Sequence, residues 1–222
     1  MLHHFDTDLD NLKQKLLAMA SHAETAVNRA VQALVERDYT LALQVKDDDK
    51  VLDQFEVEID DLAIHLLAKA PLASDLRLIT VAMKISQNLE RVGDEAAKIA
   101  KRARDLSQEP PLKQSVDIPA MARLAVRMLK TSLDSFVEHD PAAARALIPG
   151  DKEVDLLNKQ IHRALAQVMV ADPATIGRCL NLMIVSKSLE RIADHATNVA
   201  EEVVYLCEAQ DIRHSDKRIA QA

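Results

Sequence analysis

Four pairs of acidic residues have the types and the spacing to bind metal ions. They are Asp49/Asp53, Glu90/Asp94, Asp151/Asp155 and Glu190/Asp194. Residues four apart in an α-helix lie on one face, one turn from each other, and two like charges there repel by about a few tenths of a kcal/mol. A hard cation between two such helices would remove this repulsion, and oxygen-only ligands suit Mg, Mn, Ca or iron. These eight residues are therefore the candidate metal ligands.

The position of the pairs supports this interpretation more than their spacing does. Thirty-five acidic residues in 222 give roughly five such pairs by chance, and the chain contains eight. Met83 precedes Glu90 by seven residues, and Met183 precedes Glu190 by seven, which places both pairs at the edge of an apolar helix face. The alternative is a solvated rim on which neighbouring arginines serve as ion-pair partners.

No other constellation demands catalysis. Ferritin-like oxidases take an E-x-x-H pair from two of their helices, and that pattern is absent, which disfavours redox chemistry. His195, beside Asp194, is the one plausible extra ligand. Cys179 and Cys207 form no C-x-x-C motif and are expected as reduced thiols in a helical core. We expect a protein that is not an enzyme; a carboxylate-bridged di-metal enzyme and a metal-free helical scaffold are the alternatives.

Composition excludes several classes of protein. The formal net charge of −7 argues against a nucleic-acid partner, and only 3 glycines leave no phosphate-cradling loop. No apolar run approaches the ~20 residues of a membrane helix, and the first residues lack a secretory pattern. We therefore expect a cytoplasmic protein without direct membrane insertion.

Proline and glycine positions predict the helices. They are expected near residues 6–37, 40–69, 74–107, 119–139, 142–170 and 174–210, with a linker at 108–118. Helices of this length with short connections are typical of antiparallel bundles.

The two halves of the chain repeat each other. Residues 83–100 and 183–200 are identical at 8 of 18 positions, and the Asp49-Lys50-x-x-Asp53 segment corresponds to Asp151-Lys152-x-x-Asp155. The sequence therefore predicts an all-α protein of two tandem antiparallel three-helix bundles, residues 1–110 and 111–222, that arose by internal duplication.

The motifs Glu90-Arg91-Val92-Gly93-Asp94 and Glu190-Arg191-Ile192-Ala193-Asp194 resemble those of the PhoU family of phosphate-signalling regulators. Residues 73–78, both Asp-Lys-x-x-Asp segments and the tail at 210–214 extend the resemblance over nearly the whole chain. It implies metal clusters of iron, manganese, zinc or magnesium on the E(D)-x-x-x-D motifs. It also implies a cytoplasmic homodimer that couples a phosphate ABC transporter ATPase to a sensor histidine kinase and represses the phosphate-starvation response.

Two departures predict that the repeats differ. The first repeat has an extra Glu56/Asp60 pair where the second has Asn158 and His162. Pro149-Gly150 directly precedes Asp151 and is expected to break or kink that helix. We therefore expect the second metal site to hold fewer ions than the first, or none.

Overall fold

The computed structural model describes residues 2–69, 72–113 and 116–213. Over these residues the chain forms α-helices and one short 3₁₀ turn, with no strand. The elements are α1 (Leu2–Glu36), α2 (Tyr39–Leu67), α3 (Ala73–Ser107), α4 (Ile118–Glu138), α5 (Pro141–Leu147), α6 (Gly150–Ala171), η1 (Pro173–Thr175) and α7 (Ile176–Glu208).

Aspartates mark several helix starts. Asp38 accepts a hydrogen bond from the backbone N–H of Leu41, and Asp117 does the same for Ala120. These side chains satisfy backbone donors that have no partner within the helix, which is why Asp is favoured at this position.

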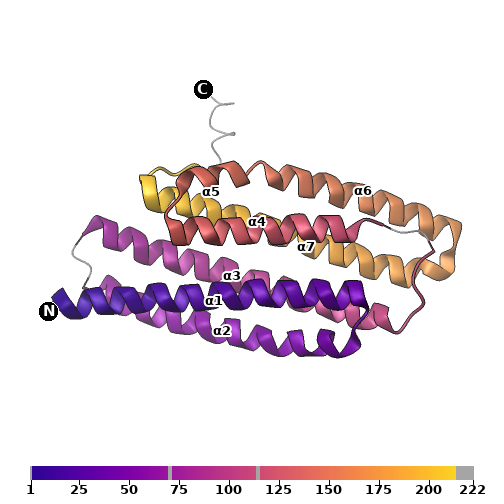
Figure 1. Cartoon of the computed structure of the whole chain (residues 1–222), viewed down its shortest axis with the longest axis horizontal. Coiled ribbons are helices and arrows are strands. Elements are labelled where there is room, and N and C mark those ends of the chain that lie inside the picture. Colours follow the sequence, from indigo (N-terminus) through magenta and orange to yellow (C-terminus); the bar gives the residue numbers. More distant parts are fainter. Residues whose placement is uncertain (1, 70–71, 114–115, 214–222) are drawn as a thin grey trace, which may run out of the picture.

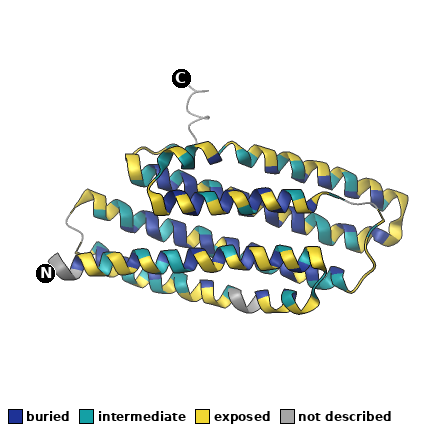
Figure 2. Ribbon diagram, in the orientation of Figure 1, coloured by how far each residue is buried: buried dark blue, intermediate teal, exposed yellow. Residues whose placement is uncertain are grey.

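Helices α1–α3 form one bundle and α4–α7 form the other, and the bundles lie side by side along their length (Figure 1). Helix α3 of the first bundle packs against α7 of the second, and α1 also contacts α4. Buried residues follow the inward faces of the helices (Figure 2), and Leu89 and its repeat equivalent Leu189 are both fully buried. None of the described helices is long and apolar enough to span a membrane.

The predicted fold class of two tandem three-helix bundles is confirmed, with one correction to the elements. The helix predicted at 142–170 is two helices, α5 and α6, which are separated by Ile148 and Pro149. Proline lacks the N–H that would continue the hydrogen-bond ladder, so the helix is interrupted there, and the break or kink expected at Pro149-Gly150 is confirmed. The domain boundary predicted at residue 110 falls in the connection between α3 and α4.

Candidate functional site

The first acidic cluster lies where α2 faces α3. Burial raises the pKa of Asp49, and the negative charges of Asp53 and Asp94 raise it further, so carboxylates of the two helices act on each other. Gly93 permits this close approach: a Cβ there would lie 2.4 Å from Leu52 Cδ1 and 3.4 Å from Asp49 Oδ1. A Cβ at position 93 would require the buried side chain of Leu52 to shift, so glycine here lets α2 and α3 pack closely beside the cluster.

Glu90 joins the same cluster from α3. Burial is the largest cause that raises its pKa, and the positive charge of Arg91 opposes the rise. The charges of Asp94, Glu56 and Asp53 raise the pKa again. Arg91 Nε lies 3.2 Å from Glu90 Oε2, yet this buried oxygen accepts no hydrogen bond in the described part of the chain. The cluster therefore has more negative charge than its neighbours compensate.

The second acidic cluster lies between α6 and α7. Asp151 stands in the first turn of α6, where burial and then the charge of Asp155 raise its pKa. Burial, followed by the charges of Asp151 and Glu190, raises the pKa of Asp194 to about 7. Asp151 and Asp194 also share a hydrogen bond. Two carboxyl groups in this arrangement hold a proton between them near neutral pH.

The two clusters differ in their surroundings. In the second repeat, Ser186 Oγ donates to Asn158 Oδ1 at 2.8 Å, and His162 Nε2 lies 3.0 Å from Ser186 Oγ. Glu56 and Asp60 occupy the equivalent positions of the first repeat, and Glu56 interacts with Asp60 and with the first cluster. A hydrogen-bonded network of Asn158, Ser186 and His162 thus replaces an acidic pair, whereas the expected difference in metal content stays a prediction.

The structure places all eight predicted ligands in these two clusters, four in each. Within the described residues, however, no three His, Cys, Asp or Glu side chains converge closely enough to form a ready-made metal site. Metal binding therefore remains a prediction.

His195, the predicted extra ligand, points into the seam between the bundles. Its Nδ1 lies 2.9 Å from Asn88 Oδ1 on α3. Burial lowers its pKa, so the imidazole is neutral at neutral pH. In that state Nδ1 is the donor to Asn88 and Nε2 keeps a lone pair.

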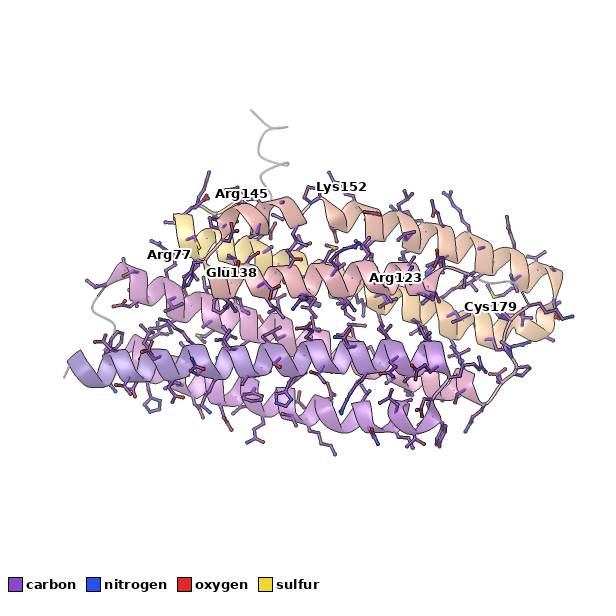
Figure 3. All side chains as sticks on the ribbon, viewed as in Figure 1. Arg77, Arg123, Glu138, Arg145, Lys152 and Cys179 are labelled. Carbon is purple, nitrogen blue, oxygen red and sulfur yellow. The ribbon has the colours of Figure 1, made fainter. Side chains whose placement is uncertain are left out.

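The two thiols have different environments. Cys179 is buried near the start of α7 (Figure 3), with its Sγ 3.7 Å from Thr175 Oγ1. Cys207 is exposed in the last turn of α7. Its predicted place in the core is wrong because this end of α7 turns that position toward solvent.

Two buried glutamates join the bundles across the α3–α7 seam, and the sequence interpretation missed both. Glu95 Oε1 accepts hydrogen bonds from Lys98 Nζ at 2.9 Å and Arg191 Nη1 at 3.1 Å. Glu202 accepts from Lys84 Nζ at 3.1 Å. Cationic residues recur every seven positions at 77, 84, 91 and 98 and line one face of α3. This row could have indicated that acidic side chains of another helix pack against that face.

A groove follows this seam, with a volume of ≈ 590 Å³. Asp94 of the first cluster contributes to its wall, and so do Asp151 and Asp194 of the second. The groove therefore links the two acidic clusters across the boundary between the repeats.

A duplicated helical bundle with one acidic cluster in each half defines a class of two-repeat helical proteins. The family model described as "PhoU domain" matches the chain twice, at residues 16–103 and 118–203. The chain belongs to the PhoU family.

Relatives agree with this assignment over almost the full length. A Pseudomonas aeruginosa protein named "Phosphate-specific transport system accessory protein PhoU homolog" is 40% identical over 96% of this chain and 91% of its own. An Aquifex aeolicus protein of the same name is 39% identical over 93% of this chain and 94% of its own. The crystal structure of PhoU from Pseudomonas aeruginosa superimposes with a TM-score of 0.90 at 39% identity, covering 93% of this chain and 100% of that one. The phosphate transport system regulatory protein PhoU from Streptococcus pneumoniae gives a TM-score of 0.86 at 26% identity, covering 94% of this chain and 99% of that one.

Proposed function

We propose that this protein is an accessory regulator of a phosphate-specific ABC transporter, and that it represses the phosphate-starvation response when phosphate is plentiful. In this role it acts in the cytoplasm, as a homodimer, between the transporter ATPase and a sensor histidine kinase. The observation that carries the proposal is the 40% identity, over 96% of the chain, to a protein named as a phosphate-specific transport accessory protein.

A role through protein contacts rather than catalysis agrees with the surface of α7. Ile176, Leu180 and Ile184 are all exposed, and their spacing of four places them along one face of the helix. Exposed apolar side chains that share a helix face favour contact with a partner protein. The relatives are named accessory or regulatory proteins, which agrees with a protein that is not an enzyme.

We also propose that each acidic cluster binds a divalent or trivalent cation: iron, manganese, zinc or magnesium. Asp49, Asp53, Glu90 and Asp94 would hold the first, and Asp151, Asp155, Glu190 and Asp194 the second. The donor set fits, because it is made of carboxylates, and one buried oxygen each of Glu90 and Asp151 accepts no hydrogen bond from the described residues. Glu190 Oε2 is instead paired with Lys187 Nζ. A bound cation would neutralise these groups and fix the spacing of the paired helices.

Elemental analysis of untagged protein, purified without chelator, tests the metal proposal. We expect about one or more metal ions per chain, and loss of this metal in the variant with Glu90, Asp94, Glu190 and Asp194 changed to Ala. A matched control changes Asp134 and Glu138, an i,i+4 pair on α4 outside both clusters, to Ala and should keep its metal. A wild type without metal would contradict the proposal and leave the fold and the family untouched.

Deletion of the protein tests the regulatory role. We expect derepression of phosphate-starvation genes in phosphate-rich medium, and restoration of repression by the wild-type chain. Unchanged expression in the deletion strain would contradict the role. Complementation with the metal-free quadruple variant then separates the two parts of the proposal, because a scaffold that needs no metal would still repress.

A further inference from the structure

The groove between α3 and α7 has three cationic side chains in its wall, and the two repeats both contribute them. Arg91 and Lys98 come from α3 and Arg191 from α7, and each side chain is about half exposed. We propose that this groove binds a phosphate-type oxyanion between Arg91 and Arg191 when the acidic clusters hold their cations. The ligand is inorganic phosphate or the phosphoryl group of a larger molecule, and the inference rests on the metal binding proposed above.

Duplication places the two arginines on opposite walls. Arg91 and Arg191 are equivalent residues of the two repeats, and the helices that carry them run in opposite directions, because Lys84 meets Glu202 near one end and Arg102 meets Asn181 near the other. The planar guanidinium group presents paired N–H donors that match the oxygens of a phosphate group.

The present partners of Arg91 are the carboxylates that would bind metal. Its Nε lies 3.2 Å from Glu90 Oε2 and its Nη1 lies 3.5 Å from Asp94 Oδ2. A cation bound by these carboxylates would compete with the guanidinium for their oxygens and would cancel part of their negative charge. Metal binding therefore makes Arg91 available to an anion in the groove.

The charge of the groove gives the same dependence on metal. Without metal, four carboxyl groups, those of Asp94, Glu95, Asp151 and Asp194, face the three cationic side chains. This balance gives an anion no net attraction. One divalent cation on each cluster would cancel two of the four negative charges there, so anion binding should be stronger in the loaded protein.

A neutral donor completes the site. Thr197 lines the groove, and its Oγ1 is buried without a hydrogen-bond partner among the described residues. A buried hydroxyl group normally has a partner, and an oxyanion in the groove would supply one.

Equilibrium dialysis of radiolabelled inorganic phosphate against the full-length chain tests the proposal. The protein is loaded with Mn²⁺, dialysed free of excess metal, and its metal content is measured before phosphate is added. We expect saturable binding of about one phosphate per loaded chain, little binding to the chelated chain, and a roughly ten- to hundredfold weaker affinity in Arg91→Gln. Arg123→Gln is the matched control, because Arg123 is exposed on α4 (Figure 3) and does not line the groove; it should bind like wild type.

Thr197→Val is a second variant that removes only the hydroxyl group, so it keeps the proposal testable if Arg91→Gln loses metal or fails to fold. It should retain its Mn²⁺ and bind phosphate several-fold more weakly. Competition by phenyl phosphate would identify a phosphoryl group on a larger molecule as the fitting ligand, and its absence would identify the free ion.

Loaded wild type that binds no phosphate would overturn the inference while the metal proposal stands. Equal affinity in wild type, Arg91→Gln and Thr197→Val would overturn it as well. If the chain takes up no Mn²⁺, the metal measurement detects this before phosphate is added. In that case the proposed metal binding is wrong, and the phosphate measurement is not needed to show it.

Discussion

Replacement of Glu95 by Gln should lower the free energy of unfolding by about 2–3 kcal/mol at pH 7. The residue is only 4% exposed, and its carboxylate accepts hydrogen bonds from Lys98 and Arg191. Two charge-assisted hydrogen bonds contribute about 1.5–3 kcal/mol each. The loss is smaller than their sum, because the Lys98 and Arg191 side chains are 46% and 50% exposed and regain water, and because Gln still accepts one bond.

The effect should depend on pH with a defined sign. Burial opposes ionisation of Glu95, but hydrogen bonds from Lys98, Ser188 and Arg191 outweigh it and lower the pKa below the usual 4.5. A carboxylate whose pKa is depressed in the folded state stabilises the protein above the unfolded-state pKa and loses that contribution as the pH falls through the folded-state value. The difference between wild type and variant should therefore shrink as the pH falls below about 4.5.

Urea unfolding followed by circular dichroism at pH 7 and near pH 4 measures both effects. Asp134→Asn is the control, because Asp134 lies 3.8 Å from Lys130 with both side chains 57% exposed, and exposed ion pairs contribute about 0–1 kcal/mol. A Glu95→Gln difference no larger than the control at pH 7, or one that persists unchanged at the lower pH, would refute the reasoning.

Three further outcomes are expected. Gly93→Ala should destabilise the protein by about 1–2 kcal/mol, because the new Cβ meets Leu52 Cδ1 at 2.4 Å. Gly177→Ala is the control and should be neutral or stabilising, because a Cβ there has nothing within 4 Å. Equal melting temperatures of the two variants would contradict this. In chelator, the wild type should lose stability as the pH rises through about 7, because the folded-state pKa of Asp194 is raised from 3.8 to about 7. Asp194→Asn should remove about 1–2 kcal/mol of that loss, which is less than the full pKa shift implies because the side chain is partly exposed to solvent. If urea unfolding shows the same change in the free energy of unfolding between pH 5 and pH 8 in wild type and variant, the prediction is wrong. Ellman's reagent should modify Cys207 in the native protein and Cys179 only after unfolding, so two native reactive thiols would contradict the assigned burial.

The helices and the acidic clusters could be predicted because their signals are local. The prolines at 110, 111 and 119 predict a linker followed by a helix near residue 119, and α4 begins at Ile118 with Asp117 as its N-cap. The i,i+4 spacing places two carboxylates on one face, and the duplication indicates that the same arrangement occurs twice.

Pro149-Gly150 predicts the break between α5 and α6, but not that the residues before it form a separate short helix. Ile148 and Pro149 keep right-handed helical backbone angles, with φ of −51° and −60°. The backbone therefore stays close to helical across the break, and Pro149 lacks the N–H that would continue the hydrogen bonds.

The seam could not be predicted from either repeat alone. In an isolated bundle Glu95 and Glu202 would lie on the surface. Each is buried because the other bundle packs over it. Their burial depends on how α3 packs against α7, which the periodicity of one helix does not specify.

The ion pairs at the seam differ between the two repeats, although the repeats arose by duplication. The difference traces to one pair of equivalent positions. Glu95 and His195 are equivalent residues of the two repeats. Glu95 accepts a hydrogen bond from Arg191 across the seam, whereas the neutral His195 is hydrogen-bonded to Asn88 and offers Arg91 no negative charge. Arg91 therefore pairs within its own helix, with two carboxylates of the first acidic cluster. One arginine joins the repeats while the other stays tied to the candidate metal ligands, so the proposed dependence of the groove on metal would follow from divergence between the repeats rather than from the fold they share.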